Sequence, residues 1–343
     1  MHPKRIRVGL IGCGRISKNH FEVMKKLNHD LELVAVCDPS EEKFKKLEEL
    51  NLEPKRYSHY ETMLKENQLD LMVLCTPSGL HPEHGILAAR HKVNVLSEKP
   101  MATTLKDADR LIYECSQNDV NLYVVKQNRL NRTIQYLKKA IEMGRFGKIY
   151  QVITNVLWTR PQSYYDADPW RGRRDLDGGA FLNQASHYVD LMFYLFGEVK
   201  SVYALNRTLA RKIEMEDSGI AVFEFENGII GTMNTSMLLF PKNYEGSVTV
   251  MGEKGTVKIG GVAVNKIEKW EFSDYNDMDK EIAEANYEPT NVYGTGHLPY
   301  YQKLIEHMRG KNSSFVDGFE GRKSLELIMG IYQSAESSKV VYF

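Results

Sequence analysis

A glycine turn between a short apolar run and a helical pattern constrains the fold of this chain more than any other feature. Ile6–Ile11 has the composition of a β-strand, and a helical pattern follows the turn and continues to Leu27. The turn itself reads GCGRIS, with serine where a third glycine is usual in dinucleotide-binding turns. The first glycine permits the tight turn, the second lets a pyrophosphate approach the backbone, and the new helix offers unpaired N–H groups. The candidate cofactor-binding residues of this turn are Gly12, Cys13, Gly14, Arg15 and Ile16.

The second strand supplies the acidic residue that such a turn needs. Leu31–Cys37 reads as a strand and ends in Asp38, about the expected 20-odd residues beyond the glycines. A carboxylate at this point binds both ribose hydroxyls of an adenosine and repels a 2′-phosphate, so the sequence favours NAD over NADP. The alternative is a plain turn aspartate before Pro39.

Strands and helices continue to alternate to about residue 126. Further strands are expected at 69–75, 93–96 and 121–125, and helices at 41–50 (with Ser40 as its cap), 84–91 and 105–117. This order predicts an α/β domain over 1–126 with a doubly wound parallel sheet of the Rossmann type. Ligands bind at the carboxyl ends of such strands. The candidate residues there are Thr76, Pro77, Ser78, His81, Glu98, Lys99 and Gln127, each of which could also be an ordinary turn or surface residue.

The second part of the chain, 127–343, has the pattern of an α+β domain. Strands are expected at 149–158, 199–208, 218–225, 229–238, 247–251 and 256–259, without helices between the later ones. Asn227-Gly228 is a strong hairpin turn. These features predict a large, mostly antiparallel sheet, accompanied by helices at 130–144, 297–308 and 320–338. Residues 266–291 are polar, show little periodicity and are expected to be irregular.

A glycine-led run, Asp177–Asp190, is the strongest candidate for catalysis in this second part. It reads as a helix ending near Gly197, and Asn183, His187 and Asp190 fall three and four residues apart on one face. His187 titrates in the range that suits a general base. The alternative is a structural histidine with satisfied hydrogen bonds.

The preceding segment, 159–177, is too long for a simple turn and is rich in Arg, Tyr, Trp and Pro. Guanidinium groups form bidentate pairs with phosphate and carboxylate, and aromatic rings stack on bases and sugars. The alternative is that the aromatic residues pack a domain interface. The candidate ligand-binding residues are Arg160, Tyr164, Tyr165, Trp170 and Arg171, with Arg173 and Arg174 beside them.

Composition excludes several partners. The 45 basic and 45 acidic residues balance, which argues against nucleic acid or an anionic membrane as a bulk electrostatic partner. No apolar run approaches the roughly 18 residues of a membrane span. The four cysteines are scattered without metal-ligand spacing, so we expect no metal site and a reduced, cytoplasmic protein.

Four motifs in order carry a resemblance to a known family. GCGRIS at 12–17, Thr-Pro-Ser at 76–78, Glu-Lys-Pro at 98–100 and the glycine-led helix with His187 resemble the glucose–fructose oxidoreductase/inositol dehydrogenase family over essentially the whole chain. The resemblance implies a Rossmann domain that binds NAD and a C-terminal sheet that commonly mediates dimers or tetramers, so we expect a homotetramer or homodimer. It also implies catalytic roles for Lys99 and His187, with the choice of base between them left open.

A narrower likeness runs through Gln127-Asn128-Arg129, 158–172 and Asp177–Asp190. These segments are similar to dehydrogenases that oxidise the 3″-hydroxyl of UDP-N-acetyl-D-glucosaminuronic acid, before transamination, on the route to diacetamido-uronic acids of bacterial O-antigen lipopolysaccharide. Asn183 departs from the wider family, which mostly carries aspartate there, and Arg173-Arg174 is more basic than expected. The likeness implies a UDP-linked amino-sugar uronic acid as substrate. It assigns catalysis to Lys99, His187 and Asn183, cofactor contacts to Gln127, Trp170 and Arg171 among others, and substrate contacts to Lys99, Arg129, Arg160, Tyr164, Tyr165, Asn183 and His187.

Other functions remain open on this sequence. The chain could oxidise another nucleotide sugar or a free polyol such as inositol, or act as a NAD-dependent glycosidase that oxidises C3 only transiently. A non-catalytic ligand sensor on the same fold is less favoured, because the chain retains both Lys99 and His187. Whether NADH is released or re-oxidised in place by a 2-oxo acid is also open.

Overall fold

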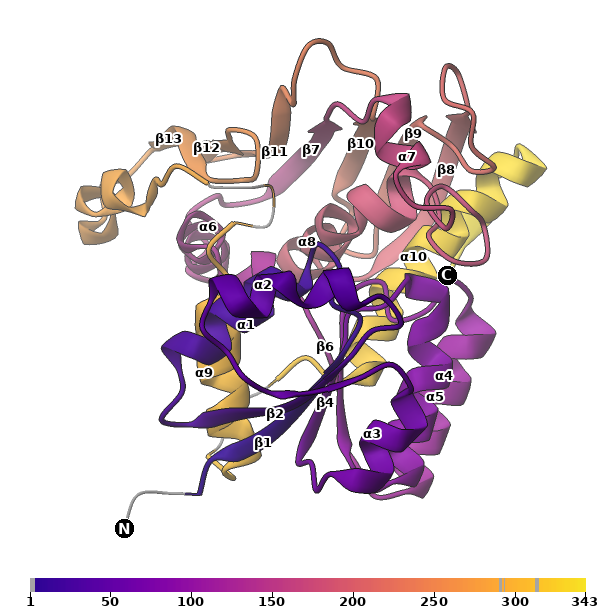
Figure 1. The fold of residues 1–343 in the computed structure, drawn as a ribbon. Helices are drawn as coiled ribbons and strands as arrows, with labels where there is room; N and C mark the ends of the chain where they lie inside the picture. The colour runs from indigo at the N-terminus through magenta and orange to yellow at the C-terminus, as the bar shows by residue number, and fades with distance from the viewer. Residues whose placement is uncertain (1–3, 290–291, 293, 312–314) are drawn as a thin grey trace. The chain divides into compact units, whose positions relative to one another are not determined.

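Two β-sheets organise the chain, one in each of two units (Figure 1). The computed structural model describes residues 4–289, 292, 294–311 and 315–343. The first unit consists of Met1–Val125 and His297–Leu325, and the second consists of Lys126–Gly296 and Glu326–Phe343. A segment from the last fifth of the chain therefore belongs to the same unit as the N-terminal strands.

The first sheet is parallel and has six strands in the order β3-β2-β1-β4-β5-β6. This is the doubly wound Rossmann order, and it confirms the predicted fold class. The order reverses between β1 and β4, where such sheets bind their ligands. The strands are β1 Ile6–Ile11, β2 Leu31–Cys37, β3 Lys55–Tyr57, β4 Leu71–Leu74, β5 Asn94–Ser97 and β6 Leu122–Val124.

Helices that bury one apolar stripe accompany this sheet. On α5, for example, Ala108, Leu111 and Cys115 are buried at spacings of three and four residues, and the Thr104 side chain caps the helix by accepting from the N–H of Asp107. The helices of this unit are α1 Ser17–Lys26, α2 Lys45–Glu49, α3 Tyr60–Glu66, α4 His81–Arg90, α5 Leu105–Gln117 and α9 His297–Met308, and α10 Gly318–Ser337 begins in this unit and ends in the second.

Two details of the first unit differ from the prediction. The expected helix over 41–50 begins as the 3₁₀ segment Glu41–Phe44, and the Ser40 side chain does not cap it. Instead, the Ser40 N–H donates to the carboxylate of Asp38 at 2.9 Å. Strand β3 and helix α3 were not predicted, because β3 has three residues and no buried side chain to mark it.

The second sheet is mixed and has eight strands in the order β13-β12-β11-β7-β10-β9-β8-β14. Only β7 and β10 pair in parallel, so the sheet is mostly antiparallel, as predicted. The strands are β7 Ile149–Leu157, β8 Val199–Arg207, β9 Ser218–Phe225, β10 Ile230–Ser236, β11 Glu245–Gly252, β12 Gly255–Gly260, β13 Lys266–Phe272 and β14 Val341–Tyr342.

The two faces of this sheet have different surroundings. Along β9, Ala221 and Phe223 are buried, whereas Ile220 and Val222 on the opposite face are about half exposed. On the buried face, a Cβ at Gly231 would lie 3.2 Å from Met192, which places the helix carrying Met192 against the sheet. The helices of this unit are α6 Arg132–Glu142, α7 Gln162–Asp166 and α8 Ser186–Phe196, with 3₁₀ segments Gln127–Leu130, Asp277–Lys280 and Ile282–Ala285.

The prediction of irregular structure over 266–291 was wrong at its start. Lys266–Phe272 forms β13, which pairs antiparallel with β12 at the end of the sheet. An edge strand has one neighbour, and most residues of β13 are charged and partly or fully exposed, so it lacks the apolar alternation of a half-buried strand. Residues 290–291, the end of that range, lie outside the described residues.

Candidate active site

The glycine turn after β1 is built on backbone contact. Gly12 has a positive φ of 89°, and a Cβ there would lie 2.6 Å from the carbonyl carbon of Cys75. Only glycine fits, because the obstacle is backbone at the exit of the neighbouring strand β4. At Gly14, by contrast, a Cβ would meet no heavy atom within 4 Å. The turn therefore leaves open space at the position where the sequence predicts the approach of a pyrophosphate.

Asp38 is fixed at the end of β2 by two backbone donors. One carboxylate oxygen accepts from the N–H of Cys13 at 2.8 Å, and the other accepts from the N–H of Ser40. The carboxylate thus links the second strand to the glycine turn. Lys46, which sequence reasoning missed, contributes a positive charge here, since its ammonium donates to the carbonyl oxygens of Cys13, at 3.1 Å, and Gly14. A lysine several residues after the acidic position has no motif spacing that would single it out.

The predicted residues after β4 are held together by a histidine. His81 is buried, and its two ring nitrogens lie 2.8 Å from the carbonyl oxygens of Thr76 and Pro100. It therefore connects the turn containing Pro77 and Ser78 to the Glu-Lys-Pro loop after β5. Burial lowers the pKa of His81.

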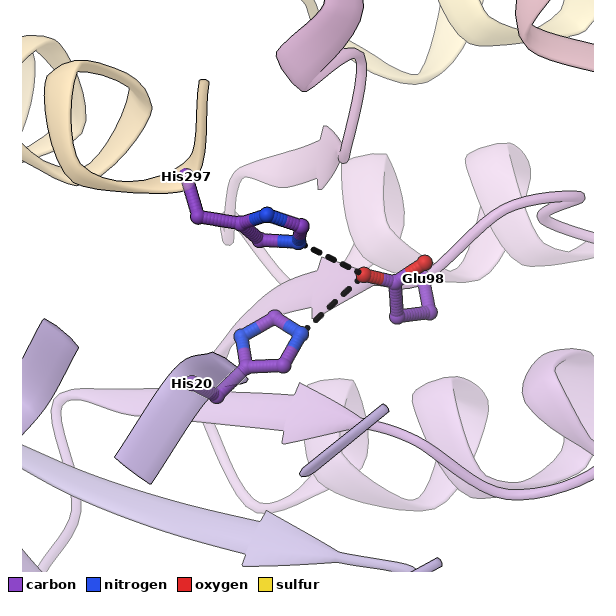
Figure 2. A group of neighbouring side chains, drawn as sticks. All are labelled: His20, Glu98 and His297. Carbon is purple, nitrogen blue, oxygen red and sulfur yellow. Dashed lines mark hydrogen bonds and ion pairs between the residues drawn. The ribbon is translucent and has the colours of Figure 1, made fainter. Parts of the chain in front are cut away.

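Glu98 of the Glu-Lys-Pro loop is almost fully buried among histidines (Figure 2). Its Oε1 lies 3.0 Å from Nε2 of His20 on α1 and 3.7 Å from Nε2 of His297 at the start of α9. Its Oε2 accepts from the N–H of Lys99 at 3.0 Å. Burial alone would raise the pKa of Glu98, but the hydrogen bond from His20 and the neighbouring His297 hold it well below its ordinary value. The prediction of a cofactor contact for Glu98 stays a prediction, and the structure shows its carboxylate turned toward these partners.

The same three side chains are the one group in the described part of the chain close enough to share a metal ion, with ligand atoms within 4.8 Å of one another. The spacing of the cysteines did not indicate this group. Residue spacing in general could not predict it, because His20 and His297 lie near opposite ends of the chain. Lys99 lies between Glu98 and Pro100, which are both buried, and is itself partly exposed. The Lys99–Pro100 peptide bond is cis.

In the second unit, the residues just after β6 pack against α8. The side-chain amide of Gln127 lies 3.0 Å from Nε2 of His187, and both residues are buried. Arg129 forms a bidentate pair with Asp190 at 2.7 and 2.8 Å, and Lys126 lies 3.3 Å from the same carboxylate. These contacts hold the face of α8 that carries His187.

The charges in this group explain the state of Asp190. Burial alone would raise the pKa of Asp190, but Arg129 and Lys126 lower it to about 2. Removing one partner of a buried pair leaves an uncompensated charge, which costs about 3–5 kcal/mol. Arg129, predicted to contact substrate, is thus engaged with Asp190 through two of its nitrogens.

The glycine-led helix is not one regular helix. Ala180–Gln184 forms a π-helical turn with a hydrogen bond from the Ala185 N–H to the Ala180 carbonyl, and α8 follows it. Gly179 makes room for a buried carboxylate, since a Cβ there would lie 2.0 Å from Oε2 of Glu216. Glu216 accepts from the Phe181 N–H at 2.8 Å, and burial raises its pKa to about 7. π-Helical turns like Ala180–Gln184 frequently occur at functional sites.

Asn183 projects from this turn, and its amide donates to Asp177, which also accepts from the N–H of Gly172 at 2.6 Å. Asp177 and Glu216 were not predicted as functional residues, and only the structure shows that they fix the turn and the loop before it.

In the loop before the π-turn, the side chains of Arg160 and Arg171 lie over aromatic rings. The Arg171 guanidinium lies 4.4 Å from the ring centroid of Tyr164 and 4.5 Å from that of Trp170, and it pairs with Asp168 at 2.8 Å. Arg160 lies 5.3 Å from the centroid of the same Tyr164 ring. The structure therefore brings together four of the predicted ligand-binding residues.

Tyr165, the fifth of these, is buried beneath that loop. Arg173 pairs instead with Asp175, and Arg174 with Glu336, all on exposed side chains. The predicted residues thus form two sets, one in each unit. The first set lies around Gly12, Asp38, the 76–81 turn and Lys99, and the second around Gln127, Asn183, His187 and the 160–171 loop.

Comparison with known proteins identifies the family from both parts of the chain. Residues 6–126 match the oxidoreductase family model for the NAD-binding Rossmann fold, and residues 138–343 match the model for the C-terminal alpha/beta domain of the same family. The chain belongs to the Gfo/Idh/MocA oxidoreductase family. It is an oxidoreductase with an NAD-binding domain, as predicted.

Two solved structures resemble the chain along its whole length. The WlbA dehydrogenase from Bordetella pertussis, solved in complex with NADH and UDP-GlcNAcA, is 49% identical with a TM-score of 0.95 and covers 100% of this chain and 99% of its own. The WlbA dehydrogenase from Chromobacterium violaceum, solved with the same two ligands, is 46% identical with a TM-score of 0.93 and covers 100% of this chain and 97% of its own. The myo-inositol 2-dehydrogenase of Thermotoga maritima is 26% identical over 98% of both chains. Among the described residues, no helix combines the length and the apolar character that crossing a membrane requires.

Proposed function

We propose that this protein oxidises the 3″-hydroxyl of UDP-N-acetyl-D-glucosaminuronic acid to the 3-keto sugar, with transfer of a hydride to NAD. The observation that carries the proposal is the full-length similarity, at 49% and 46% identity, to two dehydrogenases solved with NADH and UDP-GlcNAcA. The ketone produced is a substrate for transamination, so we place the reaction before that step in the assembly of a diacetamido-uronic acid of lipopolysaccharide. The four buried free cysteines and the NAD-binding domain support a location in the cytoplasm.

The residues of the first unit fit the cofactor. Gly12 makes the tight turn against β4, Gly14 leaves open space for a pyrophosphate, and Asp38 is held at the end of β2, where a carboxylate meets the adenosine ribose. When bound, NAD supplies the hydride acceptor. The other cofactor contacts that we propose are Cys13, Arg15, Ile16, Thr76, Pro77, Ser78, His81, Glu98, Lys99, Gln127, Trp170 and Arg171.

Oxidation of a secondary alcohol removes a hydride from carbon and a proton from oxygen. We assign the proton to His187, because an imidazole can accept it near neutral pH and Gln127 holds one ring nitrogen of this histidine. We assign polarisation of the hydroxyl oxygen to Lys99. Asn183 cannot accept a proton at neutral pH, and its hydrogen bond to Asp177 fits a role in orienting substrate.

Recognition of the nucleotide sugar falls to the aromatic and basic loop. Arg160 and Arg171 already lie over aromatic rings, so less conformational entropy is lost when their guanidinium groups meet a diphosphate or a uronate. Tyr164 supplies ring surface for the uracil or the sugar, and the buried Tyr165 packs against it with ring centroids 5.1 Å apart. A free polyol has neither anionic group, so the loop favours a nucleotide sugar over inositol.

Incubation of purified protein and NAD with a panel of UDP-sugars tests the substrate assignment. We expect UDP-N-acetylglucosaminuronic acid to lose two hydrogens, measured by mass spectrometry, because one hydroxyl becomes a ketone. A UDP-sugar without the carboxylate and free myo-inositol are the matched comparisons. An unchanged mass for the uronic acid would refute the assignment, and release of free sugar would point to a glycosidase.

Lys99→Ala and His187→Ala test the catalytic assignment. Each should reduce turnover by roughly two orders of magnitude or more, because each removes a group that acts on the transferred proton or its oxygen. NAD binding, followed by fluorescence titration, should remain. Near-wild-type rates for both variants would contradict these roles.

We also propose that the exposed face of the second sheet joins copies of this chain in a homotetramer or homodimer. Tyr203 pairs with Val222 and Leu205 with Ile220 across β8 and β9, and all four apolar side chains are at least 39% exposed. Contiguous apolar surface of this kind marks an interaction site.

Ile220→Glu combined with Val222→Glu should dissociate the assembly, because burying two like charges without partners is unfavourable. Light scattering coupled to size exclusion measures the mass. Gln333→Lys, at an exposed position on α10 and outside this sheet face, is the control for charge alone and should leave the mass unchanged. A wild-type protein that runs as a monomer at micromolar concentration would contradict the proposal.

A further inference from the structure

The loop that carries Lys99 is held at nearly every backbone polar group. The N–H of Glu98 donates to the Leu74 carbonyl at 3.0 Å, and the Glu98 carbonyl accepts from the Ser97 hydroxyl at 2.8 Å. The N–H of Lys99 donates to the Glu98 carboxylate, and the Pro100 carbonyl lies against His81. The neighbours of Lys99 on both sides are buried, whereas Lys99 itself is partly exposed. Hydrogen bonds thus fix the backbone of this loop, and Lys99 is its partly exposed residue.

The Glu98 carboxylate is the central group among these contacts. An ionised carboxylate can only accept hydrogen bonds. His20 must therefore donate from Nε2, which lies 3.0 Å from Oε1. The other ring nitrogen, Nδ1, lies 2.6 Å from the Tyr301 hydroxyl. A chain of hydrogen bonds therefore joins Tyr301, His20 and Glu98, and the other oxygen of Glu98 accepts from the Lys99 N–H.

The His297 ring points at the same carboxylate oxygen as the His20 ring, as Figure 2 shows. Its ring lies 5.5 Å from that of His20, edge to face, so the two imidazoles enclose Oε1. A buried carboxylate without donors would protonate or leave its site. His20 and His297 are nearly inaccessible to solvent and lie outside the residues to which we assign NAD or sugar contacts.

We infer that His20 and His297 are positioning residues for Lys99, acting through the carboxylate of Glu98. The inference rests on the proposed function, in which Lys99 polarises the sugar hydroxyl. The three side chains could instead ligate a metal ion. The direct contact between His20 and Glu98, with Tyr301 bound to the other ring nitrogen, favours a metal-free network, because both ring nitrogens of His20 already have a hydrogen-bond partner.

Paired substitutions test the inference. His20→Phe and His297→Phe keep the ring and remove the donor, and His20→Gln keeps an N–H near the position of Nε2. We expect the phenylalanine variants to lower kcat at least about 30-fold, because misplacement by about 1 Å can cost on the order of 100-fold. The KM for the sugar and the Kd for NADH should stay within about threefold, and His20→Gln should recover most of the rate. His59→Phe, at an exposed histidine of the same unit, is the matched control.

A second readout does not depend on sugar oxidation. Brief treatment with acetic anhydride, followed by peptide mass spectrometry, measures the modification rate of Lys99 relative to exposed Lys106 of the same unit. The phenylalanine variants should change this ratio at least about threefold, because the Lys99 side chain is no longer held in its native surroundings. If a phenylalanine variant does not fold, Tyr301→Phe, which deletes one hydroxyl, should still change the ratio in the same direction.

The outcomes separate the two proposals. A wild-type protein that oxidises no UDP-sugar defeats the proposed function, and the Lys99 modification ratio then decides the inference by itself. An active wild type with unchanged kcat and unchanged Lys99 modification in the phenylalanine variants overturns the inference. So does a stoichiometric metal ion in the purified protein that His20→Phe removes, because the group would then be a metal site.

Discussion

The first unit depends on one close contact, in which the backbone just after β1 packs against the backbone just after β4. Gly12 must turn the chain where the backbone of Cys75 leaves no room for a side chain. That contact exists because β1 and β4 are neighbours in the sheet although a second strand and a third lie between them in sequence. The carboxyl ends of the strands then meet at one edge, and the turns that follow them supply Asp38, the 76–81 turn and the Lys99 loop.

In the second unit, contacts between buried polar groups hold the candidate site residues in place. Asp190 holds Arg129 and Lys126 against α8, and Gln127, from the same short segment, contacts His187. The π-turn ahead of α8 is fixed by Glu216 beneath Gly179 and by Asp177 beside Asn183. Buried polar networks are costly unless every group has its partner, and they specify one arrangement when the partners are present. The side chains assigned to chemistry are therefore carried by regular or tightly hydrogen-bonded backbone rather than by a free loop.

The parts of this account that the sequence predicted are those written in local patterns. The glycine turn, the acidic end of β2, the alternation of strands and helices and the glycine-led run at His187 all depend on residues close together in the chain. The order of four such motifs was enough to indicate the family, which comparison then showed.

The parts that were missed depend on distant partners or on weak patterns. His20 and His297 meet at Glu98 although almost the whole chain separates them, and Glu216 explains Gly179 from a different element. Arg129 illustrates the same limit, since its residue type fits a substrate contact and only the structure shows that Asp190 engages it. Strand β13 was missed because an exposed, charged edge strand has no alternation to recognise. Packing and long-range hydrogen bonds decide such features, and they are not visible in residue spacing.

The central claim is that the hydrogen at C3 of the sugar passes directly to the nicotinamide while the hydroxyl proton goes to the protein. Single-turnover reaction with a UDP-N-acetylglucosaminuronic acid carrying deuterium at C3 tests it most directly, with mass spectrometry of the cofactor. Direct transfer predicts NADH that carries one deuterium. Unlabelled NADH, or deuterium found in the solvent, would contradict the account.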